Sequence, residues 1–209
     1  MLDVITGVSP GRAPPRLVDA FRLRHRIFVE ERRWRGLGGA DGLEIDEFDG
    51  PGAVYFIAHH GGEVVGHLRL LPTTAPHLLS EVHPFLARRR YATGPHVWEA
   101  SRHAVDRPYR GVDAAFPLAT ELTVGALEWS LAHGISEWIV ELDAGCLSRL
   151  LGLGYHITPL GLPVAIDDRQ VIAVHIACDE SVIARAGAWR VAPAPASPPE
   201  RLQFASAAR

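Results

Sequence analysis

The first clear periodicity in the chain is an amphipathic pattern over residues 13–31. Large side chains recur there at intervals of four, three and four residues, which places them on one face of an α-helix. The residues on this face are Leu17, Phe21, Arg24 and Phe28. An arginine therefore lies on an otherwise apolar stripe, and Trp34 with the glycines that follow it ends the helix.

Two β-rich runs come next, AVYFIAHH at 53–60 and EVVGHLRLL at 63–71. A pair of glycines separates them, which is a strong signal for a hairpin. Pro72 ends the second run. We expect residues 73–96 to form a long connection.

Charged residues interrupt the apolar pattern of two predicted strands. In the run 63–71, the twofold alternation of a strand puts Arg69 on the same side as His67. A further strand at 96–105 is expected to present Glu99 and Arg102 on opposite sides. The first side is expected to carry Val97, Glu99, Ser101 and His103, and the second Trp98, Ala100 and Arg102.

The second half of the chain alternates helices and strands. A helix is predicted from Pro117 to about His133, with Gly134 as its stop. Strands are predicted at 137–142 and 169–178, and short helices at 146–154 and 180–186. Helices that alternate with a strand set containing a hairpin indicate a mixed α/β or α+β sheet covered by helices.

Composition agrees with one globular domain. Of the 209 residues, 47% are hydrophobic and 22% are charged, which is enough for a substantial core. We therefore expect residues 1–190 to form a single domain. The segment 191–209 is rich in proline and alanine and is expected to be a flexible tail.

Charge and cysteine content argue against several classes of protein. The net charge of −3 provides no basic field for nucleic acid. No apolar run approaches the roughly 18 residues that span a bilayer, and the start does not resemble a signal peptide, so a cytoplasmic protein without membrane contact is expected. Cys146 and Cys178 are too few for a disulfide framework. Neither they nor the eleven histidines show metal-ligand spacing, so no metal site is predicted.

The segment DGLEIDEFD at 41–49 holds five acids in nine positions, interrupted by Leu43, Ile45 and Phe48. A solvated loop has no use for three large apolar side chains at those spacings. Buried or half-buried negative charge is therefore expected here, and a buried guanidinium such as that of Arg69 needs a carboxylate nearby. A structural network of ion pairs and a site for a charged ligand both explain these residues, and the alternatives stay open at this point.

Four separated blocks carry a resemblance to a known family. They are RLRHRIFVEERRW (22–34), DGLEIDEFD (41–49), GHLRLLPTTAPHLLSEVHP (66–84) and WEASR (98–102). In order and spacing they resemble the signature series of the acyl-homoserine-lactone synthases, the autoinducer synthases of quorum sensing. The residues that match its pattern are Arg24, Phe28, Trp34, Asp46, Asp49, Arg69, Glu99 and Arg102. Two residues depart from it: His83 stands where the family usually has Phe, and Ala100 where it usually has Leu.

The resemblance implies a fold and a reaction. The fold is GNAT-like, a three-layer sandwich with a central, mixed, mostly antiparallel sheet flanked by helices. The enzyme is an acyltransferase that joins S-adenosylmethionine to an acyl thioester and releases an acyl-homoserine lactone, methylthioadenosine and the freed thiol carrier. Both reactants are substrates, so no permanently bound cofactor is expected. S-adenosylmethionine carries an ammonium and a sulfonium, two cations that a cluster of carboxylates attracts.

The resemblance also assigns a binding site for S-adenosylmethionine. The expected contacts are Arg24, Phe28, Trp34, Asp46, Asp49, Arg69, Ser101 and Arg102. The two aspartates hold the amino-acid end of this substrate or the arginines that frame it, whereas Glu44 and Glu47 are expected to stay mainly solvated. The two aromatic residues offer faces for adenine and for the sulfonium, although core packing explains Phe28 equally well.

Catalysis requires a base and an oxyanion site. Glu99 is the predicted base for the α-amine, with Asp46 as a further catalytic carboxylate and Tyr55 as a weaker candidate. Backbone N–H groups of the strand 99–103 are expected to stabilise the oxyanion. Arg24 or Arg102 is expected to grip the substrate carboxylate during lactonisation.

The acyl donor is expected to carry a phosphopantetheine arm. PYRGVDAAF at 108–116 resembles a degenerate pyrophosphate-binding segment of acetyltransferases. The residues predicted to hold the arm are Arg102, His103, Arg110 and Gly111. The segment ITPLGLP at 157–163 is similar to the branch of the family that uses acyl-coenzyme A, which favours that donor. Arg88, Arg89 and Arg90 offer a docking face for an acyl carrier protein or only a solvated surface, so the choice of donor stays open.

Apolar faces in the second half predict the acyl pocket, although ordinary core packing explains at least half of its members. The expected lining is His83, Trp98, Leu118, Leu122, Trp129 and Val140. Acyl length and oligomeric state do not follow from the sequence. Two other functions remain as alternatives, a GNAT-type N-acetyltransferase for another amine and a non-catalytic sensor of acyl thioesters or S-adenosylmethionine.

Overall fold

The computed structural model describes residues 1–34, 36–39, 41–110 and 118–187. The predicted tail at 191–209 and Gly111 lie outside the described residues, and so does Pro117, the predicted start of a helix.

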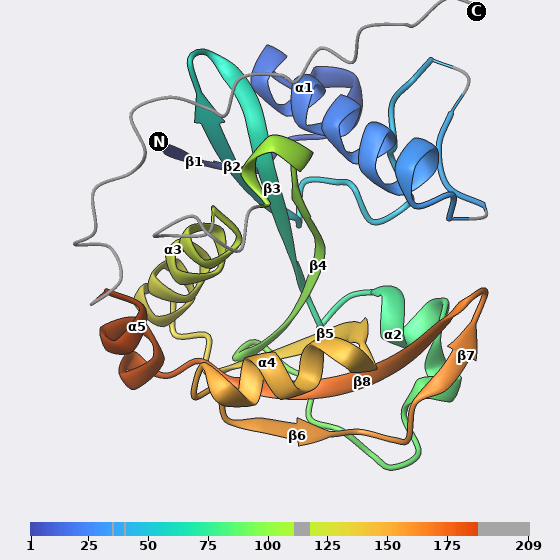
Figure 1. Ribbon diagram of the computed structural model, residues 1–209, viewed down its shortest axis with the longest axis vertical. Coiled ribbons are helices and arrows are strands. Elements are labelled where there is room, and N and C mark those ends of the chain that lie inside the picture. Colours follow the sequence, from blue (N-terminus) through green and yellow to red (C-terminus); the bar gives the residue numbers. More distant parts are fainter. Residues whose placement is uncertain (35, 40, 111–117, 188–209) are drawn as a thin grey trace, which may run out of the picture.

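A mixed sheet of eight strands forms the centre of the described part of the chain (Figure 1). The strands are β1 (Leu2–Thr6), β2 (Val54–His60), β3 (Glu63–Pro72), β4 (Val97–Val105), β5 (Glu137–Asp143), β6 (Ile157–Pro159), β7 (Val164–Ile166) and β8 (Arg169–Ala177). Their order is β1-β2-β3-β4-β5-β8-β6, and β7 pairs with β8. All these pairs are antiparallel except β4 with β5, which is parallel. The mixed, mostly antiparallel sheet is thereby confirmed.

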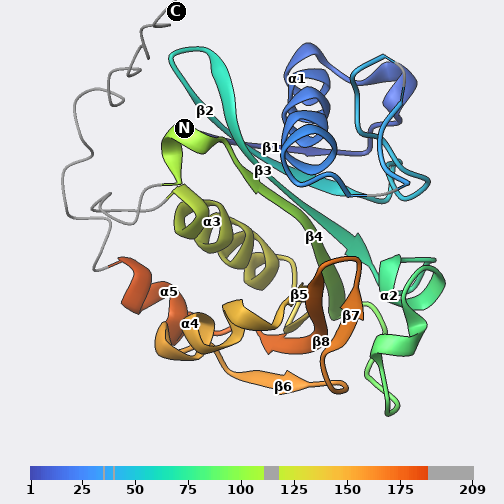
Figure 2. The ribbon, with the colours of Figure 1, turned by 45° about the vertical axis from the view of Figure 1, so that its right-hand side comes forward.

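Helices cover both faces of the sheet. They are α1 (Pro15–Arg24), which continues as the π-helical segment η2 (His25–Glu31), α2 (Leu78–Glu81), α3 (Leu118–Ala132), α4 (Leu147–Gly152) and α5 (Glu180–Gly187). Short 3₁₀ turns are η1 (Pro10–Arg12), η3 (Pro84–Leu86), η4 (Arg107–Tyr109) and η5 (Ala144–Cys146). In Figures 1 and 2, α1 lies across one face of the hairpin β2–β3 and α3 across the other. The expected sandwich of a sheet between helices is confirmed.

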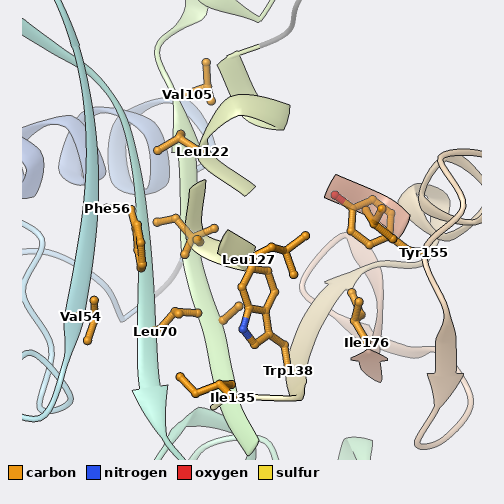
Figure 3. Close-up of a cluster of buried hydrophobic side chains, with 14 of the residues drawn as sticks. Val54, Phe56, Leu70, Val105, Leu122, Leu127, Ile135, Trp138, Tyr155 and Ile176 are labelled. Atoms are coloured by element: carbon orange, nitrogen blue, oxygen red, sulfur yellow. The ribbon is translucent and has the colours of Figure 1, made fainter. Parts of the chain in front are cut away.

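The main core lies between the sheet and α3 (Figure 3). Phe56 and Leu70 of the hairpin pack there with Leu122 and Leu127 of α3 and with Trp138 of β5. A second cluster joins α1 to the hairpin, and a third joins α2 and η3 to β4, β5 and β8. Side chains alternate between these clusters along each strand, as the pleat of a sheet requires.

Most predicted elements are confirmed, and the misses are short. Residues 15–31 are helical as predicted, although His25–Glu31 form a π-helix rather than an α-helix, and the hairpin and the described strands and helices of the second half form as predicted. The strands β1, β6 and β7 and the helix α2 were not predicted. Each has five residues or fewer, and a segment that short shows too few turns or alternations for a periodicity.

The predicted alternation in β4 is wrong from Arg102 onward. His67 of β3 pairs with Ala104 and Arg69 pairs with Ser101, so Arg102 and His103 together oppose a single residue of β3. Arg102 adopts a left-handed conformation with φ 53°. This is a β-bulge, which moves the following side chains to the other face. Arg102 therefore lies on the face of Ser101, and His103 points to α3, where its Nε2 donates to the Ala119 carbonyl (3.1 Å).

The two parallel strands β4 and β5 pair over only part of their length. Val97–Ala100 pair with Glu137–Val140, and beyond these residues β4 runs on to Val105 and β5 to Asp143 without further pairing between them. The two strands therefore separate toward their carboxyl ends. The backbone on the β5 side of β4 beyond Ala100 therefore has no strand partner within the described residues.

Candidate active site

Arg24 lies at the centre of a buried ionic network. Its side chain is 0% exposed, and its Nε donates to Oε2 of Glu44 at 2.5 Å. Its two terminal nitrogens donate to the two carboxylate oxygens of Asp49, both at 2.8 Å. Burial disfavours the charged guanidinium, but the two carboxylates outweigh burial and raise the pKa of Arg24. The predicted apolar face of the first helix thus brings a permanent cation into the core.

Arg69 extends the network from β3. Its terminal nitrogens bind Asp46 in a bidentate pair at 2.5 and 3.0 Å, and its Nη1 lies 2.9 Å from Asp49 Oδ1. Its Nε donates to the hydroxyl of Ser101 on β4 (3.1 Å). Burial disfavours the charge of Arg69, and Asp49 opposes this most strongly, so the pKa of Arg69 is raised.

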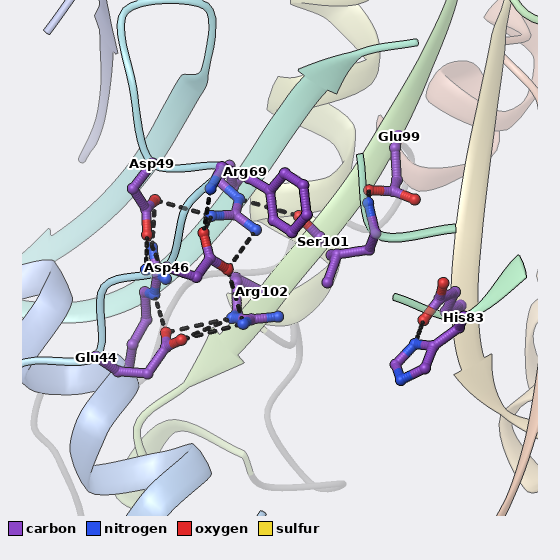
Figure 4. A network of polar contacts seen from close by, with 12 residues as sticks. Glu44, Asp46, Asp49, Arg69, His83, Glu99, Ser101 and Arg102 are labelled. Atoms are coloured by element: carbon purple, nitrogen blue, oxygen red, sulfur yellow. Dashed lines mark hydrogen bonds and ion pairs between the residues drawn. The ribbon is translucent and has the colours of Figure 1, made fainter. Parts of the chain in front are cut away.

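Arg102 completes the network from the bulge of β4 (Figure 4). Its Nη2 donates to Glu44 at 3.1 Å and to Asp46 at 2.8 Å. His67 holds this bulge, because its Nδ1 donates to the carbonyl of Arg102 at 3.0 Å. Burial lowers the pKa of His67 to about 3, so its ring is neutral. Three arginines thus face three carboxylates, and the network balances its own charge.

The acid-rich segment packs through two of its three apolar residues and turns three of its five acids toward the arginines, whereas Asp41, Ile45 and Glu47 are exposed. Leu43 and Phe48 pack against the cluster between α1 and the hairpin. Asp46 and Asp49 close a tight turn, in which the Asp46 N–H donates to Asp49 Oδ2 at 2.9 Å. Glu44, Asp46 and Asp49 thus reach the arginines, while Leu43 and Phe48 cover the core.

The prediction that Glu44 stays solvated is wrong, whereas Glu47 is exposed as predicted. Glu44 is 1% exposed and binds both Arg24 and Arg102. Burial alone raises the pKa of a carboxyl, but the two guanidiniums overcome it, so the pKa of Glu44 is lowered. The segment forms no helix or strand, so no hydrophobic periodicity marks which of its acids is buried. The burial of Glu44 could therefore not be predicted.

Two aromatic rings lie beside Arg102. Phe28 and Trp34 stack with their centroids 4.6 Å apart and an interplanar angle of 19°. The guanidinium of Arg169 lies over Trp34 at 4.4 Å from its centroid. Arg102 lies 5.8 Å from the Phe28 centroid. Phe28 is buried and packs in a core cluster, and its contact with the substrate stays a prediction.

Tyr55 lies under the network, with its hydroxyl buried and without a hydrogen-bond partner of good geometry among the described residues. Burial first, and then the negative charge of Asp49, raise the pKa of Tyr55. A hydroxyl of this kind keeps its proton at neutral pH. It is therefore a hydrogen-bond donor rather than a base.

Glu99 lies on the same face of β4 as Ser101, and its carboxylate anchors α2 (Figure 4). Its two oxygens accept the backbone N–H groups of Leu78 and Leu79, both at 2.8 Å. The carboxylate is 1% exposed. Burial is the largest cause that raises the pKa of Glu99, and the nearby charge of Glu141 raises it as well. The two backbone hydrogen bonds act in the opposite direction but do not cancel the increase. A carboxylate held in this way has lone pairs left to accept a proton.

His83 and Glu141 form an ion pair near Glu99 that was not predicted. His83 Nδ1 donates to Glu141 Oε2 at 2.7 Å, and both side chains are largely buried. The hydrogen bond to Glu141 is the main reason that the pKa of His83 is raised. The sequence analysis noted His83 because it departs from the family pattern. Nothing in the sequence indicated that its partner is Glu141 on β5.

Comparison with known proteins identifies the family. Residues 12–186 match the family model described as autoinducer synthase. The chain belongs to the autoinducer synthase family.

Two curated relatives in the family support this placement. The chain is 38% identical over 177 residues to an isovaleryl-homoserine lactone synthase of Bradyrhizobium diazoefficiens, over 84% of this chain and 79% of that protein. It is 32% identical over 169 residues to an acyl-homoserine-lactone synthase of Rhizobium radiobacter, over 78% of this chain and 79% of that protein.

Solved structures are similar along nearly the whole chain. A coenzyme-A-dependent acyl-homoserine lactone synthase, BjaI, with S-adenosylmethionine and isopentyl-coenzyme A has a TM-score of 0.82 and 36% identity, over 90% of this chain and 88% of that one. A second coenzyme-A-dependent synthase, MesI, has a TM-score of 0.81 and 31% identity, over 93% and 97%. The Escherichia coli protein ElaA, with a TM-score of 0.58 and 16% identity over 84% and 97%, shares the fold alone.

The residues predicted for the acyl pocket fall on two faces of the sheet. Trp98, Leu118, Leu122, Trp129 and Val140 all belong to the cluster between the sheet and α3. His83 lies on the opposite face, since it contacts Glu141, and Ile139, two residues earlier on the same face of β5, packs under α2. The five apolar residues thus form one wall of the core and His83 does not join them.

The residues predicted for the phosphopantetheine arm do not all lie together. Arg102 points into the ionic network and His103 points to α3. Arg110 lies at the surface, where its Nη1 pairs with Glu31 Oε2 at 2.7 Å.

Among the described residues no helix is long and apolar enough to cross a membrane.

Proposed function

We propose that the chain synthesises an acyl-homoserine lactone from S-adenosylmethionine and an acyl thioester, with acyl-coenzyme A as the donor. The observation that carries the proposal is the joint presence of buried Glu99 and the arginine network on the face of β4 where β4 and β5 diverge. The relatives described as coenzyme-A-dependent synthases support this choice of donor.

In the first step, Glu99 takes a proton from the α-amine of S-adenosylmethionine, directly or through a water molecule. Burial and the neighbouring charge of Glu141 raise the pKa of Glu99, although its two backbone hydrogen bonds act in the opposite direction. The raised pKa makes the carboxylate a better proton acceptor. The amine nitrogen then attacks the thioester carbonyl, and collapse of the tetrahedral intermediate expels the thiolate of the carrier. The thiolate leaves with a proton as the thiol.

The oxyanion of that intermediate needs hydrogen-bond donors. Beyond Ala100 the β5-facing N–H groups of β4 have no strand partner within the described residues. Donors that are fixed in place before the reaction stabilise a developing charge without reorganisation. We assign this role to the backbone of the segment 101–103.

In the second step, the carboxylate of the acylated substrate attacks its own γ-carbon. The carbon–sulfur bond breaks, and the electron pair leaves with methylthioadenosine. Because the step is intramolecular, its main requirement is a folded substrate conformation. Arg102 is the arginine best suited to hold the substrate carboxylate, since it is the most exposed of the three and its Nη1 makes no hydrogen bond with the described residues.

In this proposal Asp46 and Asp49 position the arginines rather than contact the cationic substrate. Each aspartate already binds two guanidiniums, so neither has a free face for an ammonium. Glu44 has the same role between Arg24 and Arg102.

An acyl carrier protein as the donor remains a second possibility to test. Arg88, Arg89 and Arg90 are exposed, which docking requires. Arg89 donates to the carbonyl of Pro159, which holds its side chain against β6. We expect the triple variant Arg88→Gln, Arg89→Gln and Arg90→Gln to leave activity with acyl-coenzyme A unchanged.

The test of the proposed function is an assay with the purified protein, S-adenosylmethionine and a set of acyl-coenzyme A thioesters. Release of methylthioadenosine, together with an acyl-homoserine lactone detected by mass spectrometry, supports the proposal. Acylation of another amine without methylthioadenosine indicates an N-acetyltransferase. Binding of both substrates without any product indicates a sensor.

A further inference from the structure

Two arginines outside the ionic network lie over Trp34, and a third lies near Arg32. The guanidinium carbon of Arg169 lies 4.4 Å from the centroid of this ring, and that of Arg32 lies 5.5 Å from it. Arg110 joins them through its ion pair with Glu31, the chain neighbour of Arg32. Arg32, Arg110 and Arg169 are called the outer arginine cluster below. They come from the end of η2, from the chain after β4 and from the start of β8.

Within the part of the chain that the structure describes, the outer arginine cluster has one ion pair, between Arg110 and Glu31. Within the described residues, the guanidiniums of Arg32 and Arg169 have neither a carboxylate partner nor a hydrogen-bond acceptor, and only Arg110 is paired. Partial burial, and then the positive charges of Arg110 and Arg169, lower the pKa of Arg32. Like charges held this close repel one another, and an anion between them removes the repulsion. The ionic network around Arg24 differs, because each of its arginines has carboxylate partners.

The cluster lies beyond the carboxyl ends of the two parallel strands. Arg110 follows β4, and its Nε donates to the Val105 carbonyl at 2.6 Å. Arg169 begins β8, whose Val171 pairs with Asp143, the last residue of β5. Ligands of open α/β sheets bind outside the carboxyl ends of the strands. An acyl donor with its thioester between the diverging strands therefore extends its phosphates toward these arginines.

We propose that Arg32, Arg110 and Arg169 bind the phosphate groups of the phosphopantetheine arm of the acyl donor, with Arg32 and Arg169 as the residues that hold them most directly. Guanidinium groups suit phosphates, because their planar fork donates two parallel hydrogen bonds. The inference rests on the proposed function, since it assigns the donor-binding part of the same site. Coenzyme A and a carrier protein both present such an arm.

The test compares donors with and without phosphates. KM and kcat are measured for isovaleryl-coenzyme A and for isovaleryl-pantetheine, which has the same thioester and no phosphate. For Arg32→Gln and for Arg169→Gln we expect KM for the coenzyme A thioester to rise about tenfold or more, as the loss of a charge-assisted hydrogen bond predicts. KM for the pantetheine thioester stays unchanged.

Arg22→Gln is the matched control. Arg22 is exposed on α1, pairs with Asp19 at 2.6 Å and loses the same charge without changing the cluster. An equal rise of KM for both thioesters in the cluster variants overturns the proposal, because it indicates a structural role. Unchanged KM for isovaleryl-coenzyme A and also for isovaleryl carrier protein overturns it as well. A rise with the carrier protein alone supports phosphate binding and identifies the carrier as the source.

Binding of free coenzyme A, measured by calorimetry, separates this inference from the proposed function. We compare the parent protein with the double variant Arg32→Gln, Arg169→Gln. An affinity for coenzyme A that is at least tenfold weaker in the variant supports the cluster as a phosphate site. That result stands even when no thioester yields methylthioadenosine, an outcome that refutes the synthase activity alone. Affinity that is equal in both proteins, together with unchanged KM values, refutes the cluster alone.

Discussion

At the scale of single residues, the partners of a side chain decide its role. Glu44 and Glu47 stand three positions apart in the same acid-rich segment, yet Glu44 is buried between two arginines and Glu47 is exposed. Glu99 shows a double role, since its carboxylate both anchors α2 and faces the predicted substrate side of β4. A test of Glu99 must therefore separate chemistry from folding.

Replacing Glu99 by Gln is expected to lower kcat by about 10²- to 10⁴-fold, the usual contribution of a general base. The amide cannot accept a proton, and its NH₂ group faces a backbone N–H where the carboxylate accepted a hydrogen bond. Rates of methylthioadenosine release measure the effect. Thermal unfolding and calorimetry with S-adenosylmethionine show whether the fold and substrate binding persist. A variant that binds substrate normally and keeps the parent kcat would remove Glu99 from the base role.

His83→Phe restores the residue that the family pattern has at this position. The pKa of His83 is raised by Glu141, so its ion pair stabilises the fold fully below about pH 6.5, the ordinary value for histidine, and this contribution is lost as the pH rises through the raised value. We therefore expect the difference in melting temperature between parent and variant to be larger at pH 5.5 than at pH 9. A difference that is equal at both pH values contradicts the role of the ion pair.

At the scale of elements, the β-bulge of β4 has the largest consequence for the site. Without the bulge, Arg102 faces α3 and the ionic network lacks its third arginine. The alternation of a strand predicts the face of Ser101 correctly and that of Arg102 wrongly, because one extra residue reverses the face of those that follow. The helix α2 escaped prediction because it has four residues, and the contact that satisfies its first N–H groups comes from Glu99, on a different element.

The packing of β3 against α3 can be tested at Gly66. A Cβ at this position lies 2.7 Å from Leu122 Cδ1 and 3.3 Å from the Cβ of Ala58, both in the main core. We expect Gly66→Ala to destabilise the protein by about 1–3 kcal/mol through overpacking. Urea unfolding measures the change, and Gly11→Ala, which meets no atom within 4 Å, serves as the control. A gain in stability for Gly66→Ala contradicts the close approach.

At the scale of the whole molecule, the ionic network joins parts that are distant in the sequence. Arg24 comes from α1, Asp46 and Asp49 from the acid-rich segment, Arg69 from β3 and Arg102 from β4. Each guanidinium is desolvated, so the loss of one carboxylate leaves charge without a partner in the core. The network therefore contributes to folding as well as to the site.

Asp49→Asn is expected to destabilise the protein by about 3–5 kcal/mol, because it leaves Arg24 and Arg69 short of a carboxylate. Glu47→Gln, an exposed acid two residues away, is the control and is expected to have little effect. Urea unfolding at neutral pH measures both variants. An equal effect of the two substitutions would show that the network does not stabilise the fold.

Acid is expected to unfold the protein through the same carboxylates. Burial raises the pKa of Glu44 and of Asp49, but the guanidiniums outweigh it and the pKa of both carboxyls is lowered. As the pH falls through about 4, these carboxyls therefore take up protons in the unfolded chain before they do so in the folded protein. The stabilisation is present above that pH and is lost on further acidification. Unfolding free energies between pH 6 and pH 3 measure the loss, and the slope is expected to be smaller in Asp49→Asn. A slope identical to that of the parent contradicts this source of acid sensitivity.

The sequence by itself determined the features that depend on near neighbours. The helix with Arg24 on its apolar face, the hairpin that carries Arg69, the strand that carries Glu99 and the four blocks that resemble the family all follow from short-range patterns, and the structure and the comparisons confirm them. Tertiary structure alone decided that Glu44 is buried, that Arg102 turns toward it and that His83 pairs with Glu141. Those outcomes depend on contacts between residues 58 positions apart, and no local period records such a distance.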